Sequence, residues 1–134
     1  MIRTKKIAIL AIIAMVLTLL PVSLFAATAD SNRLSGADRI GTAIEVADAG
    51  WTTAGTVILA PADQANLVDA LAAAPLAGQE NAPILLTGKA SLNAATKAKI
   101  AALGATKVYV VGAIADSVVA EVNAMTGVTA EKLS

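Results

Sequence analysis

The sequence predicts an α/β fold, a small three-layer sandwich with a mostly parallel sheet built from consecutive βα units. Three short apolar runs, rich in β-branched residues, lie at residues 56–60, 83–87 and 107–111. Nearly continuous apolar runs are typical of strands that are covered on both faces. Equivalent positions in successive runs are 27 and 24 residues apart, which is too long for a hairpin and suits a crossover helix between parallel strands.

Two helices are predicted on either side of the first strand. Residues 38–49 place apolar side chains on one helical face, with Ser35 or Asp38 as the capping residue. Residues 66–77 show the same periodicity, and Pro75 either kinks this helix or marks its end. The second helix is therefore the expected crossover between the first two strands.

Two further helices are predicted after the second and third strands. Residues 93–103 begin at Asn93, a favourable capping residue, and residues 117–125 present valines and a methionine at helical spacing. The predicted helices are rich in alanine. Because alanine is small, it lets a helix lie close to a sheet, so its abundance has a structural explanation.

The amino-terminal segment, residues 1–29, has the layout of a secretory signal peptide. Three basic residues precede an uncharged apolar run at residues 7–20, and Pro21 follows. The run has 14 residues, whereas a permanent membrane-spanning helix needs roughly 20. We therefore expect export and cleavage, with an uncleaved membrane anchor as the competing interpretation.

The cleavage site is predicted from the small residues that follow. Residues 27–29 match the A-x-A pattern and place the cut before Asp30, and a cut after Ala26 is the alternative. The remaining residues, 30–134, are enough for one domain with one modest core.

Composition excludes several classes of site from this body of the chain. The sequence has no Cys and no His, which excludes disulfides, thiolate chemistry, imidazole catalysis and most zinc sites. No cofactor and no metal site are predicted. Loss of three basic residues with the signal peptide leaves seven basic and ten acidic side chains. We therefore expect neither a nucleic-acid partner nor stable membrane insertion after cleavage.

The two ends of the body share a short similarity. Residues 32–35 read Asn-Arg-Leu-Ser and residues 131–134 read Glu-Lys-Leu-Ser. One interpretation is that the four similar positions arose by chance. The other is that residue 134 lies where a second copy of the same unit would begin.

Four motifs, taken in order, resemble the cell wall-binding repeat 2 family. They are Arg-Leu-Ser-Gly-Ala-Asp-Arg at 33–39 with Thr-Ala at 42–43, Asn66 followed by Asp-Ala-Leu-Ala-Ala-Ala-Pro-Leu-Ala at 69–77, Ala-Pro-Ile-Leu-Leu-Thr at 82–87, and Val-Tyr-Val-Val-Gly at 108–112. Together they cover nearly all of residues 33–134.

The resemblance implies a noncatalytic anchoring module of Gram-positive surface proteins. Such modules usually occur as three tandem copies beside a separate functional region, and the copies form a compact triangular unit on anionic cell-wall polysaccharide. The implied location is secreted, at the cell wall. The implied partners are that polysaccharide and further repeats in cis, or a homo-oligomer such as a trimer.

The chain departs from the family pattern in three places. It holds one copy, which lowers the expected avidity for the wall. The loop at residues 63–69 lacks the usual Gly-x-Asn-Phe-Pro-Asp but keeps an Asn and the second Asp, and Gly112 is followed by Ala113 rather than by a second glycine.

Six residues are predicted to bind the ligand, because ligands of parallel sheets gather at the carboxyl ends of the strands or because the residues belong to the family motifs. They are Arg33, Arg39, Asn66, Asp69, Thr87 and Lys89.

These residues and their neighbours have structural explanations as well. Arginine is a bidentate donor for carboxylate or phosphate, but either Arg can instead pair with an acid or join one copy to the next. Asn66, Asn93, Asp116 and Ser117 are also suited to capping helices.

Trp51 and Tyr109 are the only aromatic residues of the body. Sugar sites often use aromatic platforms, so this scarcity argues against recognition by stacking. Trp51 is expected to pack against the first helix and Tyr109 to lie in the core.

Two alternatives to a binding module stay open. An enzyme would rely on Asp63, Asp69 and Asp116 holding Mg²⁺ for phosphoryl transfer, but their spacing fits no dedicated metal motif and the sequence has no phosphate-binding glycine loop. The other alternative is a truncated remnant of a multi-repeat surface protein without independent function.

Overall fold

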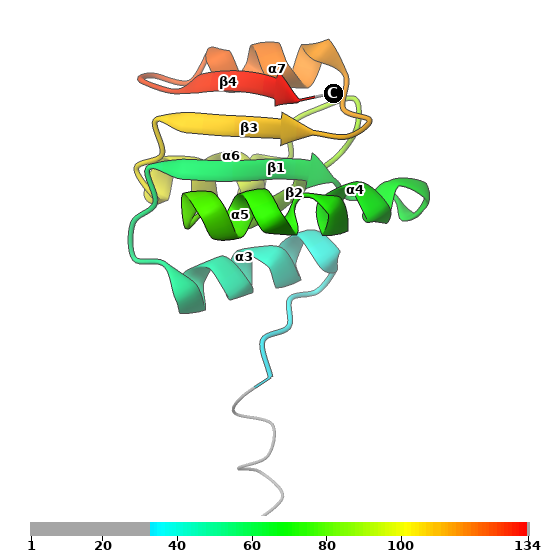
Figure 1. The fold of residues 1–134 in the computed structure, drawn as a ribbon, viewed down its shortest axis with the longest axis vertical. Coiled ribbons are helices and arrows are strands. Elements are labelled where there is room, and N and C mark those ends of the chain that lie inside the picture. The colour runs from blue at the N-terminus through cyan, green and yellow to red at the C-terminus, as the bar shows by residue number, and fades with distance from the viewer. Residues whose placement is uncertain (1–32, 134) are drawn as a thin grey trace, which may run out of the picture. The chain divides into compact units, whose positions relative to one another are not determined.

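A four-stranded, all-parallel sheet organises residues 33–133, the part of the chain that the computed structural model describes (Figure 1). The strands are β1 (Thr56–Pro61), β2 (Ile84–Thr87), β3 (Lys107–Val111) and β4 (Thr129–Leu133), in the spatial order β2-β1-β3-β4. The α/β prediction and its three strands are confirmed. The predicted signal peptide at residues 1–29 lies outside the described residues.

The helices follow the predicted order, with one division. They are α3 (Arg39–Gly50), α4 (Leu67–Ala72), α5 (Ala74–Glu80), α6 (Ala94–Ala102) and α7 (Asp116–Asn123), and a short 3-10 helix, η2 (Gln64–Asn66), precedes α4. Pro75 lies in the first turn of α5, where its missing N–H has no helical partner to lose. The proline thus separates α4 from α5. None of the described helices is both long and apolar enough to span a bilayer.

The strand order decides which helices cover which face of the sheet. The chain steps from β1 to β2 in one direction and then returns past β1 to β3 and β4. Because parallel crossovers are right-handed in nearly all proteins, this reversal requires α6 and α7 to lie on the face opposite α4 and α5. Figure 1 shows this arrangement, with α4 and α5 on the viewer's side of the sheet.

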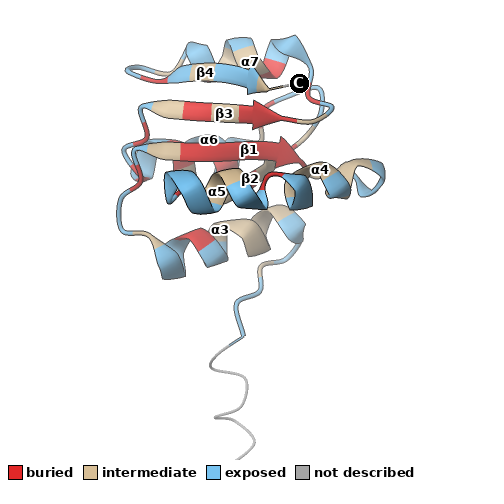
Figure 2. Ribbon diagram, in the orientation of Figure 1, coloured by how far each residue is buried: buried red, intermediate tan, exposed pale blue. Residues whose placement is uncertain are grey.

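Each face of the sheet has its own apolar cluster. In β1, Val57 and Leu59 belong to the cluster that includes residues of α3, α6 and α7, whereas Ile58 and Ala60 belong to the cluster beneath α4 and α5. All four side chains are fully buried. Figure 2 shows this burial as the red that runs along β1 after its first residue. The near-continuous apolar run that predicted β1 is thus the result of burial on both faces.

The edge strand β4 was not among the predicted strands. It pairs in parallel with β3, from Lys107 opposite Thr129 to Val111 opposite Leu133. Its side chains are exposed or half-buried along its whole length. An edge strand of this kind has no apolar run, so apolar runs in the sequence do not reveal it. The sequence pattern at residues 131–134 shows only the short similarity to residues 32–35.

The first family motif forms the entry into α3. The side chain of Asp38 caps the helix by accepting a hydrogen bond from the backbone N–H of Gly41 (2.7 Å). Gly36 packs so closely on this turn that a Cβ at Gly36 would lie 2.3 Å from the carbonyl carbon of Gly41. The glycine is therefore required by a close approach of two backbone segments.

Candidate functional site

The direction of the chain through the sheet reverses at β1 and β3, which are neighbours in the strand order. The connections after these two strands leave toward opposite faces of the sheet, and such a switch point is where ligands bind in parallel α/β sheets. Beside this point, a crevice of about 240 Å³ opens between α4, α5 and the carboxyl ends of β3 and β4, lined by Asp69, Ala72, Ala73, Leu76, Val111, Gly112 and Leu133. All of these except Leu133 belong to the family motifs described above.

A larger hollow of about 560 Å³ lies at the other end of the fold. It is bordered by the ends of α6 and α7, with Lys97, Thr106 and Met125 among its lining residues. None of its lining residues belongs to the four motifs. The crevice beside the switch point is therefore a better candidate site than this hollow.

Asp69 and Gly112 form the rim of the crevice. The backbone N–H of Ala113 donates a hydrogen bond to Oδ2 of Asp69 (3.2 Å). Gly112 has a φ of +73°, and a Cβ at this position would lie 2.3 Å from the same carboxylate oxygen. Asp69 thus joins α4 to the loop after β3, and glycine is required because the carboxylate occupies the space of a side chain.

Arg39 fixes the loop after β1. Its Nη1 donates to the carbonyl of Ala62 (2.8 Å) and its Nη2 donates to Oε1 of Gln64 (2.9 Å). Arg39 thus binds a backbone carbonyl and a side-chain amide, and not an acidic side chain as the sequence also allowed. The Arg39 side chain remains exposed, so a wall contact by Arg39 stays a prediction.

Thr87 lies beneath the loop after β2 and is fully buried. Its hydroxyl oxygen accepts a hydrogen bond from the N–H of Asn93 (2.8 Å), and the hydroxyl donates to the carbonyl of Ser91 (3.3 Å). The hydroxyl therefore shapes the turn that leads into α6, and in this structure it does not face solvent. Direct contact of Thr87 with a ligand stays a prediction, and the geometry gives it a structural role.

The remaining predicted residues are more accessible. Lys89 is exposed, and its carbonyl accepts a hydrogen bond from the N–H of Ala115 (2.9 Å), which joins the loops after β2 and β3. Asn66 is half-buried at the start of α4 and its side chain makes no capping bond. Arg33 is exposed and precedes the compact unit that begins at Leu34. Among the loops that follow β1, β2 and β3, Lys89 therefore supplies the exposed positive charge.

The residues considered as helix caps have different roles. Asn93 caps α6 by accepting from the N–H groups of Ala95 (2.9 Å) and Thr96 (3.2 Å), as predicted. Ser117 instead donates to the carbonyl of Ala90 (3.1 Å). Its hydroxyl therefore links α7 to the loop after β2.

Asp116 forms an ion pair with β4. Its Oδ1 lies 2.7 Å from Nζ of Lys132, and this hydrogen bond holds the pKa of the Asp116 carboxyl below its ordinary value. Within residues 33–133, no three acidic side chains, including Asp63, Asp69 and Asp116, are grouped in a way that could hold a metal ion. The Mg²⁺ arrangement considered from the sequence is not formed there.

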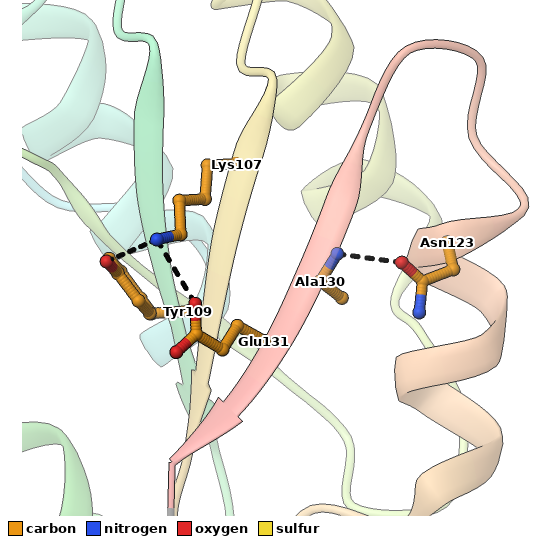
Figure 3. A network of polar contacts seen from close by, with 5 residues as sticks. All are labelled: Lys107, Tyr109, Asn123, Ala130 and Glu131. Carbon is orange, nitrogen blue, oxygen red and sulfur yellow. Dashed lines mark hydrogen bonds and ion pairs between the residues drawn. The ribbon is translucent and has the colours of Figure 1, made fainter.

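The two aromatic residues lie in different surroundings. Trp51 packs against the cluster that includes α3, and its Nε1 donates to the carbonyl of Asn81 (2.9 Å). Tyr109 is half-buried on the face of the sheet that carries α4 and α5. Lys107 donates to its hydroxyl and pairs with Glu131 (Figure 3). The alternation of side chains along β3 places Tyr109 on this face of the sheet. The residue stays partly exposed to solvent because α4 and α5 lie over β1 and β2.

The chain is similar to known proteins along most of this fold. Residues 33–121 match the model of the family described as cell wall binding domain 2 (CWB2). Among characterised proteins, it is 35% identical over 88 residues to the N-acetylmuramoyl-L-alanine amidase LytC and 32% identical over 100 residues to the amidase enhancer, both of Bacillus subtilis. The matches cover 64% and 72% of this chain but only 17% and 14% of those proteins.

Two solved structures share the fold. Cwp8 from Clostridium difficile matches with a TM-score of 0.65 and 35% identity, over 75% of this chain and 19% of that one. Cwp6 from the same organism matches with a TM-score of 0.62 and 26% identity, over 75% of this chain and 16% of that one. The family model matches residues 33–121, which include α3 to α6, most of α7 and the rim of the crevice, so this chain belongs to the cell wall binding domain 2 family.

Proposed function

We propose that the chain is an exported, noncatalytic module that attaches a protein to the Gram-positive cell wall by noncovalent contact with anionic wall polysaccharide. Membership of a cell wall binding family carries this proposal, together with a crevice built almost entirely from the family motifs. The relatives are several times longer than this chain. Whatever further activity they have is not assigned to it.

The proposed binding surface comprises the loops at the carboxyl ends of the strands. Lys89 supplies an exposed cation, and Arg39 keeps its guanidinium exposed while it fixes the loop after β1. Both are suited to the anionic groups of a polymer. Asp69 lines the crevice and Asn66 lies at the start of α4, and sugar hydroxyls are suitable partners for both side chains. Arg33 and Thr87 complete the set of residues proposed to bind the polymer.

Sedimentation with purified Gram-positive walls tests this proposal. We expect residues 30–134 to sediment with intact walls and to remain in solution once the anionic polymers have been extracted. Salt should weaken the binding, because exposed charges are screened. Absence of sedimentation, for the single module and for tandem copies alike, would contradict the proposal.

Two charge variants locate the contact. Lys89→Ala should weaken wall binding roughly three- to tenfold, because it removes a charge-assisted hydrogen bond. Lys97→Ala is the matched control, since Lys97 is an exposed lysine on α6 that borders the other hollow. Equal loss for both variants would point to general charge attraction instead of a site.

Export is part of the proposal. The mature amino terminus should begin at Asp30, or at Ala27 if the alternative site is used. Mass spectrometry of the protein recovered from a Gram-positive culture decides between these two and the uncleaved anchor. Further repeats in cis, or a homo-oligomer such as a trimer, are the proposed partners that raise its avidity.

A further inference from the structure

Among the residues that the structure describes, no helix covers the β3 and β4 part of the sheet on the side that carries α4 and α5. Figure 1 shows α5 and α4 lying over the β2 and β1 side of the sheet, while β3 and β4 face the viewer without a helix across them. Lys107, Tyr109 and Val111 alternate onto this face of β3, and their register partners Thr129, Glu131 and Leu133 do the same on β4. The alternating residues Val108 and Val110 are fully buried on the other face.

We call the five residues Lys107, Tyr109, Val111, Glu131 and Leu133 the β3–β4 strip; Val111 is buried, and the other four are exposed or half-buried. Its central feature is the Tyr109 ring, which an ion pair holds in place. Nζ of Lys107 lies 2.5 Å from the Tyr109 hydroxyl and 3.1 Å from Oε2 of Glu131 (Figure 3). The same nitrogen lies over the Tyr109 ring, 4.2 Å from its centroid, so Lys107 contacts both the ring and its hydroxyl.

The strip continues into the crevice. Val111 and Leu133 are opposite each other in the register of β3 and β4, and both line the 240 Å³ cavity. Tyr109 precedes Val111 by two residues on the same face, which is about 7 Å along a strand. The aromatic ring and the cavity are thus neighbours on one surface that leads from the open sheet face to the proposed site.

We propose that the β3–β4 strip binds the sugar residues of the wall polysaccharide that lie next to the residue held in the crevice, with Tyr109 as the stacking platform. The inference rests on the function proposed above and adds a second surface to it. A sugar offers an apolar ring face and hydroxyl groups at its edge. The strip offers an aromatic ring that carries a hydroxyl group, with an ammonium and a carboxylate beside it, which is the matching arrangement.

The charges of the strip select the part of the polymer that it contacts. Lys107 and Glu131 neutralise each other, and their side chains are still 40% and 52% exposed. A neutral pair has hydrogen bonds to offer to hydroxyl groups but no net attraction for a phosphate or carboxylate. We therefore assign the uncharged part of the sugar chain to the strip, and the anionic groups to the loops that carry Lys89 and Arg39.

The test combines shift mapping with a pair of variants, using residues 30–134 and soluble polysaccharide released from purified Gram-positive walls. Amide signals of residues 107–112 and 129–133 should shift on titration. Tyr109→Leu keeps an apolar side chain without the ring, and should weaken binding roughly three- to tenfold. Tyr109→Phe keeps the ring and should bind more tightly than Tyr109→Leu.

The outcomes separate this inference from the proposed function. Shifts confined to residues 62–69 and 88–93, or a folded Tyr109→Leu variant that binds like the wild type, would overturn the strip while leaving wall binding intact. Concentration-dependent shifts of the strip without polysaccharide would show that a second copy covers it, and would also overturn the inference. No binding of the wild type to the walls would overturn both. If Tyr109→Leu does not fold, shift mapping of the wild type decides alone.

Discussion

At the scale of single residues, the contact between Asp69 and Gly112 joins the two halves of the switch point. The carboxylate accepts from the N–H of Ala113 and occupies the space where a side chain at position 112 would project. The positive φ of Gly112 is a further requirement for glycine. Asp69 therefore has a structural role in addition to the binding role proposed for it.

Gly112→Ala should lower the free energy of unfolding by about 2 kcal/mol or more, since it adds strain at positive φ to a clash with Asp69. Gly78→Ala is the matched control. Gly78 lies inside α5 with no atom within 4 Å of an added Cβ, so alanine there should stabilise by roughly 0.5–1 kcal/mol. Urea unfolding measures both, and equal effects of the two variants would contradict the role assigned to Gly112.

At the scale of elements, β4 is held by its neighbours rather than by its own burial. Its side chains are exposed or half-buried, but it pairs with β3 along five positions. The side chain of Asn123 on α7 accepts a hydrogen bond from the N–H of Ala130 (2.8 Å), and Lys132 pairs with Asp116 at the start of α7 (Figure 3 shows the first of these). The strand is therefore an edge that polar contacts attach to α7.

Lys132→Met should return the pKa of the Asp116 carboxyl toward its ordinary value of 3.8, because the hydrogen bond from Lys132 is the main cause of the lowering. A carboxyl whose folded pKa is depressed adds stability above its unfolded pKa, and this is lost as the pH falls through the folded pKa. The wild type and the variant should thus converge in stability at acid pH. Carbon-detected NMR titration of Asp116 measures the shift, and Lys97→Met should leave it unchanged; an unaltered Asp116 titration in Lys132→Met would refute the assignment.

At the scale of the whole molecule, one module presents a shallow crevice and an open strip, and both are small for tight binding. The cavity of about 240 Å³ is below the range of roughly 300–1,000 Å³ that encloses a drug-sized ligand. A single module is therefore expected to bind the polymer weakly. Linked copies convert later binding events into intramolecular ones.

Three copies of residues 30–134 joined in tandem should bind walls about 10² to 10⁴ times more tightly than one copy, provided that the linkers let all copies reach the polymer. Sedimentation at a series of wall concentrations measures both affinities. A tandem in which two copies carry Lys89→Ala and Tyr109→Leu is the control and should approach the single module. An affinity that does not depend on copy number would argue against multivalent attachment.

The sequence by itself determined the buried strands, the helices and the turn residues. The run that became β1 is apolar because both faces of that strand are covered, and the runs that became β2 and β3 have fully buried residues on one face. The caps at Asp38 and Asn93 follow from local hydrogen bonding. These features are local, so composition and spacing are enough to predict them.

Only the tertiary structure decided where the candidate site lies. The order β2-β1-β3-β4 placed the switch point between β1 and β3 and left one face of β3 and β4 open, and strand order depends on pairings between segments far apart in the chain. That order exposed part of Tyr109, which the sequence placed in the core. The loop between β2 and α6 covers Thr87, which the sequence placed at a ligand. Burial depends on which helix crosses which strand, and no single segment of the sequence carries that information.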